Sequence, residues 1–230
     1  DLMQSIALEN NLSETAFINI NESPIPIRWF TPTLEVNLCG HATMASAKIL
    51  FEYFPSIAGT EISFNSKSGI LNVTKHAEDI CLNFPTDKPE PQKMDALFAE
   101  ALGESPIEIL RGTDDFLAVF ETEQQIQAMN PDFSKLSKIN SRGVVISAPG
   151  NDVDFVSRCF FPQTGVDEDP VTGSAHTMLI PYWAKQLDKI ELKAHQLSAR
   201  GGVLDCKLIN DRVLISGKSV VYFEGMISII

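Results

Sequence analysis

One pattern of residues occurs twice in this chain, and it constrains the fold more than any other feature. Residues 39–45 and residues 172–178 each place a glycine before small residues at the start of an apolar helical stretch. Each copy follows an acidic connection, residues 33–35 in the first half and residues 166–169 in the second. An apolar helix must be buried on all sides. Because two copies are too few for a solenoid, the repeat predicts a duplicated, two-lobed architecture with a sheet around each helix.

Hydrophobic periodicity predicts a mixed α+β fold in which the second half repeats the element order of the first. The strands after the first apolar helix are closely spaced, which indicates antiparallel pairing rather than helical crossovers. We place the boundary between the lobes after residue 112, giving lobes 1–112 and 113–230. Helices are predicted over 2–9, 40–54, 94–102 and 174–186, with short helical stretches at 124–129 and 133–137; strands are predicted over 14–20, 25–30, 62–65, 70–74, 80–84, 116–120, 144–147 and 155–161, with at least four more from the last helix to the end.

Charge and cysteine content exclude several classes of function. The chain has 18 Lys and Arg against 30 Asp and Glu, a net charge of −12 that disfavours nucleic acid and anionic membranes as partners. No apolar run is long enough to span a bilayer. The four cysteines form no CxxC pair and show no zinc-ligand spacing, so we expect free thiols, no metal and a cytoplasmic location. A small anionic substrate remains compatible, because backbone dipoles act locally.

The two glycines, Gly40 and Gly173, mark candidate anion-binding sites. A helix N-terminus presents unpaired N–H groups and a partial positive charge, and a glycine lets a ligand approach the backbone closely. Two such termini facing each other would hold a carboxylate and stabilise an enolate-like intermediate. The alternative is that each glycine only allows tight packing of a helix against a sheet.

Two carboxylates have candidate roles in proton transfer. Glu14 lies where a polar loop enters an apolar strand, and partial burial there would raise its pKa toward a useful acid–base value. A solvated carboxylate at the strand entrance is the competing interpretation. Asp169 precedes Pro170, and this pair is also an ordinary helix-start signal, with aspartate at the N-cap and proline at N1.

Histidines follow both glycines within one helical turn, His41 in the first copy and His176 in the second. The helix dipole disfavours a cation there, so a neutral hydrogen-bonding or proton-relay role is predicted. A structural histidine is an equally good interpretation of His176. Arg200, beside a Gly-Gly turn, could anchor an anion or pair with a surface carboxylate.

Taken together, these segments resemble the phenazine-biosynthesis PhzF-like family, within the diaminopimelate epimerase and proline racemase superfamily. The likeness covers essentially the whole chain, with its motifs in matching order. The segments that carry it are Met3-Gln4…Ala7…Glu9…Asn11-Leu12-Ser13-Glu14-Thr15-Ala16-Phe17, Ile27-Arg28-Trp29-Phe30-Thr31-Pro32, Leu38-Cys39-Gly40-His41-Ala42-Thr43, Ser157-Arg158…Phe160…Pro162, Glu168-Asp169-Pro170-Val171-Thr172-Gly173-Ser174-Ala175 and Gln196…Ser198…Arg200-Gly201-Gly202.

The resemblance implies a diaminopimelate epimerase-like fold: two pseudo-symmetric lobes, each a curled, mainly antiparallel sheet around a central helix, with the active site in the cleft. It implies proton transfer without metal or organic cofactor, and it admits a homodimer. The best-known member isomerises a dihydro-hydroxyanthranilate. The residues implied for the site are the proton-shuttling Glu14, with His41 and Asp169, and the substrate-binding Gly40, Gly173 and Ser174.

The chain departs from the family pattern in two places. The family begins with a strand and a Gly-Asn-Pro loop that reaches the active site, and the sequence shows no counterpart before Asp1. The racemases and epimerases of the superfamily use two cysteines, one before each glycine. Here Cys39 holds the first position and Thr172 the second. A threonine hydroxyl is too weak an acid or base to replace a thiol.

The resulting hypothesis is a cofactor-independent isomerase that acts on a small carboxylate-bearing metabolite. Two alternatives stay open at this point: an amino-acid epimerase or racemase that uses Cys39 with an unconventional partner, and a non-catalytic small-molecule-binding protein of the same fold. The sequence does not identify the substrate or the oligomeric state.

Overall fold

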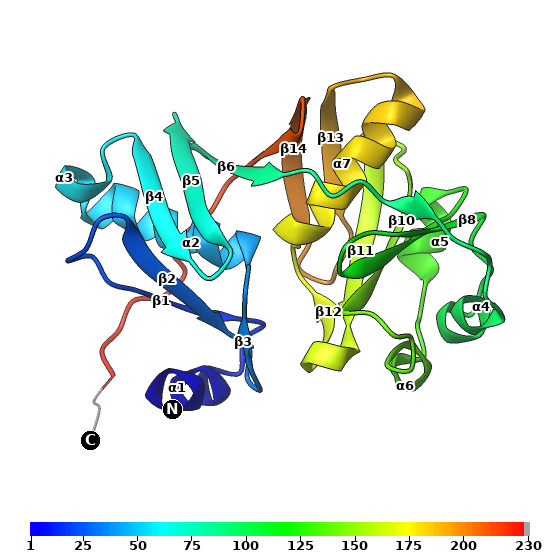
Figure 1. Cartoon of the computed structure of the whole chain (residues 1–230), viewed down its shortest axis with the longest axis horizontal. Coiled ribbons are helices and arrows are strands. Elements are labelled where there is room, and N and C mark those ends of the chain that lie inside the picture. The colour runs from blue at the N-terminus through cyan, green and yellow to red at the C-terminus, as the bar shows by residue number, and fades with distance from the viewer. Residues whose placement is uncertain (228–230) are drawn as a thin grey trace.

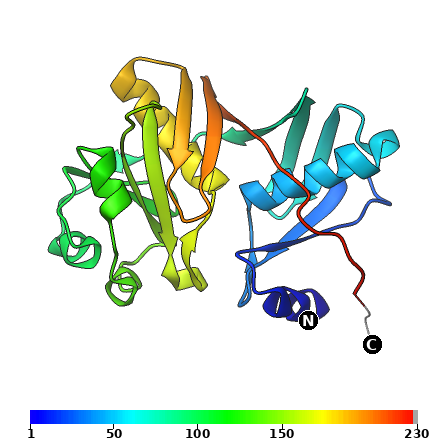
Figure 2. The same ribbon diagram turned by 180° about the vertical axis from the view of Figure 1, so that it is seen from behind.

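The computed structural model describes residues 1–227, and its elements form two lobes that lie side by side (Figure 1). The first lobe is a twisted sheet with a long helix across one face, as the view from behind shows (Figure 2). In chain order it contains α1 (Leu2–Asn10), β1 (Thr15–Ile18), β2 (Ile25–Phe30), β3 (Glu35–Val36), α2 (Gly40–Tyr53), α3 (Pro55–Ala58), β4 (Glu61–Ser66), β5 (Gly69–His76) and β6 (Asp79–Pro85).

The second lobe repeats this plan around a more deeply buried helix, α7. Ten of its 15 residues are buried, which confirms the prediction of an enclosed apolar helix. The elements are β7 (Glu90–Pro91), α4 (Ala96–Leu102), β8 (Glu108–Arg111), β9 (Asp115–Val119), α5 (Glu123–Ala128), α6 (Phe133–Leu136), β10 (Gly143–Pro149), β11 (Phe155–Phe161), the 3-10 turn η1 (Pro162–Thr164), β12 (Val166–Asp169), α7 (Gly173–Leu187), β13 (Glu191–Gln196), β14 (Gly202–Ile209) and β15 (Arg212–Gly217).

The strands of both lobes join into one continuous sheet. Its order is β1-β2-β4-β5-β6-β15-β14-β13-β11-β10-β9-β8-β7, with β3 added to β2 and β12 added to β11. The lobes meet at the antiparallel pair of β6 and β15. Most pairs are antiparallel, as predicted, but β2–β4, β9–β10 and β11–β13 are parallel. The mixed α+β class and the two-lobed arrangement are therefore confirmed. Along residues 1–227, no helix is both long and apolar enough to cross a bilayer.

The strand pairing supports a lobe boundary other than the predicted one after residue 112. Strand β8 pairs with β9, and β7 pairs with β8, so β7 and β8 continue the sheet beyond β9. Phe98 and Leu102 of α4 pack into the same core cluster as Phe120. These contacts place residues 90–111 with the second lobe, and we propose a division between β6 and β7.

The end of the chain also differs from the prediction. Three strands follow α7 within the described residues, instead of at least four. Residues 218–227 contain no helix or strand and run back across α2 of the first lobe (Figure 2). The side chains of Tyr222 and Phe223 are 98% and 80% exposed. Residues 228–230, the end of the predicted second lobe, lie outside the described residues.

Candidate active site

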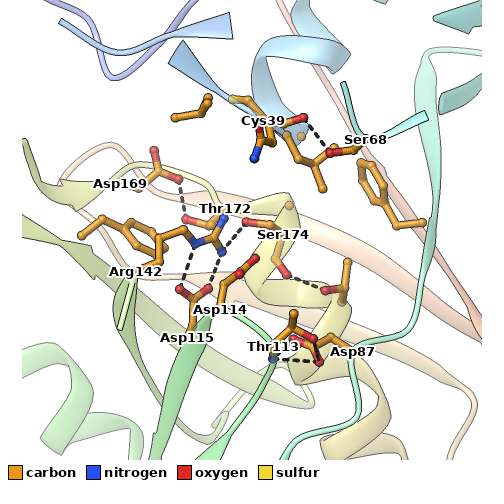
Figure 3. A pocket seen from close by; sticks show the side chains of 18 of the residues that line it. Cys39, Ser68, Asp87, Thr113, Asp114, Asp115, Arg142, Asp169, Thr172 and Ser174 are labelled. Atoms are coloured by element: carbon orange, nitrogen blue, oxygen red, sulfur yellow. Dashed lines mark hydrogen bonds and ion pairs between the residues drawn. The ribbon is translucent and has the colours of Figure 1, made fainter. Parts of the chain in front are cut away.

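A cavity of about 510 Å³ opens between the lobes, where α2 and α7 begin. Residues from both lobes line it, and Figure 3 shows the side of the cavity that includes Asp169, Thr172 and Ser174. The structure brings all six predicted site residues to its wall, although they come from segments more than 150 positions apart. These residues are Glu14, Gly40, His41, Asp169, Gly173 and Ser174.

The two helices meet end to end at their first glycines. A Cβ atom built on Gly40 would lie 2.9 Å from the Cα of Gly173, and one built on Gly173 would lie 3.0 Å from the Cα of Gly40. Within residues 1–227, neither N-cap residue, Cys39 or Thr172, caps its helix with its side chain. The first turns of both helices therefore line one cavity, and within these residues no N-cap side chain occupies their N–H groups, as an anion site requires.

Glu14, His41 and Asp169 form a carboxylate–imidazole cluster at the same point. The Glu14 Oε2 atom lies 3.2 Å from His41 Nε2, and the Asp169 Oδ1 atom lies 3.9 Å from His41 Nδ1. Each ring nitrogen thus faces one carboxyl group, and each carboxyl group comes from a different lobe. The side chains are 15%, 20% and 6% exposed for Glu14, His41 and Asp169, so water screens their interaction only weakly.

Burial and mutual contact set the pKa values in this cluster. Burial raises the pKa of Glu14, but hydrogen bonding and attraction to His41 outweigh it and leave that pKa below its usual value. Burial lowers the pKa of His41, but contacts with Cys39, Glu14 and Asp169 leave it well above its usual value. Burial, only partly offset by His41, raises the pKa of Asp169 to about 6.

These directions differ from the two sequence-based predictions. Glu14 was expected to have a raised pKa because of burial alone, and His41 was expected to be neutral because of the helix dipole. The ion pair between them reverses both effects, since each stabilises the charged form of the other. The carboxyl group with the raised pKa is Asp169.

Asp169 does not cap α7; hydrogen bonds from neighbouring side chains fix its position. It ends β12, whereas α7 begins at Gly173 with Thr172 as its N-cap, so the N-cap interpretation of Asp169 is wrong. The Thr172 hydroxyl donates a hydrogen bond to Asp169 Oδ2. The Gln196 amide donates to the Asp169 carbonyl at 2.7 Å and to Thr172 Oγ1 at 3.1 Å. This network fixes Asp169 beside His41 and occupies the Thr172 hydroxyl.

Sequence reasoning missed one charged pair in the cavity wall, Arg142 and Asp115. Arg142 Nε donates to Asp115 Oδ1 at 2.9 Å, and Arg142 Nη2 donates to Ser174 Oγ at 3.1 Å (Figure 3). Arg142 directly precedes β10 and Asp115 begins β9, so the parallel pairing of these strands brings the two side chains together. Arg200, in contrast, is exposed and lies outside the cavity lining.

Comparison with known proteins identifies the family. A family profile described as phenazine biosynthesis-like protein (PhzC-PhzF) matches residues 1–225. The chain belongs to this PhzF-like family. It is 48% identical over 227 residues to an uncharacterized isomerase of Pseudomonas aeruginosa, which covers 99% of this chain and 87% of that protein. It is 35% identical over 258 residues to a human phenazine biosynthesis-like domain-containing protein, covering 99% of this chain and 88% of that protein.

Solved structures agree with this assignment. A PhzF-family protein of Enterococcus faecalis superimposes with a TM-score of 0.91 at 45% identity, covering 96% of this chain and 85% of that one. A hydroxyproline epimerase of Agrobacterium vitis superimposes with a TM-score of 0.59 at 11% identity, covering 91% and 72%. The second likeness shows the fold alone, and it confirms the epimerase-like architecture of this PhzF-like protein.

His176, the histidine of the second copy, does not join the cluster. It is fully buried, and its Nδ1 atom lies 2.7 Å from the Thr172 carbonyl. A carbonyl oxygen only accepts, so Nδ1 carries the proton and Nε2 is the bare acceptor. That Nε2 atom has no hydrogen-bond partner among residues 1–227. Burial therefore lowers the pKa of His176 to about 4, which is the behaviour of a structural histidine in this PhzF-like protein.

The buried neutral His176 should make folding stability depend on pH. In the unfolded chain His176 has a pKa near 6.5 and binds a proton below that pH. In the folded protein His176 binds this proton only near pH 4 and below. Stability therefore falls as the pH falls through this window. Relative to a His176→Asn variant, which keeps a donor near Nδ1, the protein should lose about 2–3 kcal/mol between roughly pH 7.5 and pH 4.5. Urea unfolding of both proteins at each pH measures this difference.

Asp169 affects stability with the opposite sign, because its raised pKa makes the folded state bind more protons. It is present in both proteins, so its effect cancels in the comparison. If the free energy of unfolding of the protein and of the His176→Asn variant changed with pH in parallel, the pKa of His176 would not be lowered in the folded state.

Proposed function

We propose that this PhzF-like protein is a cofactor-independent isomerase that moves a proton on a small, carboxylate-bearing metabolite. One observation carries the proposal: Glu14, His41 and Asp169 lie in one cluster, in the wall of a cavity that the first residues of α2 and α7 also line. General acid–base catalysis needs a positioned proton acceptor, and electrostatic stabilisation needs donors aimed at the developing negative charge. The cavity supplies both.

Each residue then has a defined task. Glu14 is the ionised group that removes a proton from one carbon and returns it to another, consistent with its lowered pKa. His41 stands between the two carboxyl groups and stabilises the charge of Glu14. The first turns at Gly40 and Gly173, together with Ser174, hold the substrate carboxylate and the enolate-like charge. Asp169 orients His41 and is the second acid of the cluster.

The position of Thr172 argues against a two-thiol racemase. Its hydroxyl donates to Asp169 and accepts from Gln196, and a neutral hydroxyl is too weak a base to take a proton from carbon. Cys39 is the one thiol in the cavity lining, and burial raises its pKa. A neutral buried thiol is a weak base, so the single carboxylate of Glu14 is the better proton acceptor.

The cysteines and the net charge support a cellular location and a class of partner for this activity. All four cysteines are free, buried thiols, which fits a reducing cytoplasm. The net charge of −12 makes a small metabolite a better partner than nucleic acid or an anionic membrane. A homodimer is part of the proposal, by resemblance to the family.

Exchange of hydrogen with solvent tests the proposal directly. The purified protein in D₂O should transfer deuterium into at least one compound from a panel of small unsaturated carboxylates that includes a dihydro-hydroxyanthranilate. Mass spectrometry measures the deuterium gained when the proton held by Glu14 exchanges with solvent before its return, and NMR locates the deuterium and detects the isomerised product. Binding of a carboxylate, measured by calorimetry, with neither isomerisation nor exchange across the panel would favour the non-catalytic binding protein instead.

A Cys39→Ser variant separates the isomerase from a thiol-dependent epimerase. Because Glu14 is the proton acceptor in the proposed reaction, the variant should retain exchange within about tenfold of the original rate, whereas loss of a catalytic base costs about 10²–10⁴-fold. Exchange rates of both proteins against the same compound decide the question. A drop of more than about a hundredfold, with the fold intact by circular dichroism, would return the thiol to the mechanism.

A further inference from the structure

The contact between Arg142 and Ser174 determines how the Ser174 hydroxyl can donate. Ser174 is the second residue of α7, and its Oγ atom lies 3.1 Å from Arg142 Nη2 (Figure 3). A guanidinium group only donates hydrogen bonds, so Ser174 Oγ accepts here and its own proton points elsewhere. Within the described part of the chain, Ser174 Oγ makes no other hydrogen bond. Because Ser174 lines the cavity, its proton is available to an acceptor bound there.

The guanidinium group of Arg142 is held on several sides. Its Nε atom donates to Asp115 Oδ1 at 2.9 Å, and Nη2 donates to Asp115 Oδ2. The Cζ atom lies 5.3 Å from the centre of the Phe161 ring. The backbone N–H of Arg142 donates to the Asp114 carbonyl at 2.9 Å. A two-point contact with a carboxylate fixes the plane of a guanidinium group, so the donor that faces Ser174 has a set direction.

These contacts leave the Nη2 atom of Arg142 with no N–H group for a ligand. Nη2 carries two N–H groups, and they are directed to Asp115 Oδ2 and Ser174 Oγ. The single N–H of Nε is directed to Asp115 Oδ1. Asp115 also balances the charge of Arg142, which weakens the attraction of the pair for an anion. Arg142 is therefore better placed to act on a bound anion through Ser174 than by direct contact.

We propose that Arg142, held by Asp115, is a positioning residue that directs the Ser174 hydroxyl proton toward the carboxylate of the substrate. Ser174 also lies in the first turn of α7, where the backbone N–H groups have no partner within the helix. One residue thus offers a side-chain donor and a backbone donor to the same carboxylate. The identification of this anion as a substrate rests on the proposed function, whereas the binding of a carboxylate requires no reaction.

Calorimetry with benzoate measures the binding alone. The unaltered protein should bind benzoate at least about tenfold more tightly than the neutral benzamide, because hydrogen bonds to a charged group are the stronger ones. Ser174→Ala should weaken benzoate binding by about 10–100-fold, and Ser174→Thr, which keeps the hydroxyl, should bind within about threefold of the original. Equal affinities for benzoate and benzamide, or an unchanged affinity in Ser174→Ala, would overturn the proposal.

Substitution of Arg142 tests the positioning role. Arg142→Lys keeps a charge opposite Asp115 but lacks the planar fork, so benzoate should bind at least about fivefold more weakly. With one exchanging compound, KM should rise by a similar factor while kcat changes less than about threefold, because the carboxylate is held equally in the ground and transition states. If Arg142→Lys does not fold, Arg142→Met combined with Asp115→Leu removes both charges, a replacement that buried ion pairs often tolerate, and the same loss of affinity is expected.

A double variant separates action through Ser174 from direct contact with the ligand. Arg142→Lys combined with Ser174→Ala should bind benzoate as weakly as Ser174→Ala alone, since no hydroxyl remains to be positioned. Losses that multiply in the double variant would mean that Arg142 contacts the anion itself, and they would overturn the proposal.

Arg212→Lys is the matched control for these variants. Arg212 also donates through two nitrogens, to the Asn83 side chain at 2.8 Å and to the Asn83 carbonyl at 2.9 Å, but it lies outside the cavity lining. Its benzoate affinity and KM should stay within about twofold of the original. Dependence of benzoate binding on Arg142 in a protein that exchanges no deuterium would support the positioning role and contradict the proposed function. Exchange with an unchanged KM in a folded Arg142→Lys would do the reverse.

Discussion

Replacement of Glu14 by glutamine should lower the rate of solvent-deuterium incorporation by about 10²–10⁴-fold, the usual cost of losing a general base. Glutamine has nearly the same shape as glutamate and can still contact His41, but its amide does not accept a proton from carbon. In the structure, Glu14 is the carboxylate at 3.2 Å from His41 Nε2, and contact with His41 keeps its pKa below the usual value. Parallel exchange assays on the two proteins, with one shared substrate, measure the loss.

The cavity offers a matched control for this substitution. Glu35 also lines the cavity, but its oxygens lie 2.8 Å from Arg28 Nε and 2.6 Å from Lys67 Nζ, away from the cluster. Glu35→Gln removes the same charge from the wall and a partly exposed ion pair worth up to about 1 kcal/mol, so exchange should change by less than about tenfold. Equal losses in both variants would mean that cavity charge, rather than a proton acceptor at Glu14, governs the rate.

The sequence was a good guide where the structure depends on local pattern. The starts of α2 and α7 at Gly40 and Gly173 were predicted to within one residue, because the apolar helical pattern of each stretch begins there. Strands β2 and β11 have the predicted bounds because a local hydrophobic pattern also marks them in the sequence. Convergence of the six site residues was predicted from family resemblance, and the cavity lining contains them all.

Features that depend on distant partners were not predictable in this way. The pKa of Glu14 depends on His41, 27 positions away, so a rule based on burial alone gave the wrong direction. Strand β8 is four residues long and takes its place from pairing with β9, and the lobe boundary that we propose rests on this pairing. Arg142 and Asp115 meet only because β9 and β10 run parallel. A local sequence pattern does not predict which distant strands or side chains come into contact.

The contact between the first residues of α2 and α7 makes Gly40, after Glu14, the second position where a substitution should have a large effect. An alanine there would place its Cβ 2.9 Å from the Cα of Gly173, closer than side-chain carbons normally approach a backbone atom. Overpacking of this kind costs about 1–3 kcal/mol, while alanine in place of glycine in a helix gains at most about 1 kcal/mol. The net effect of Gly40→Ala should therefore be destabilising, and urea unfolding measures it.

The effect of Gly40→Ala on exchange should exceed its effect on stability. Relief of the overlap separates the first turns of α2 and α7, which moves the N–H groups proposed to hold the substrate charge, and a misplacement of about 1 Å can cost about 10²-fold in rate. Gly217→Ala is the control, because its Cβ would lie 3.5 Å or more from its neighbours, an ordinary contact, at a position outside the cavity lining. If Gly40→Ala destabilises the protein but exchanges deuterium at the original rate, the glycine contact serves packing alone. The proposed anion site would then have to lie elsewhere along the cavity wall, with Arg142 as the cationic side chain nearest Ser174.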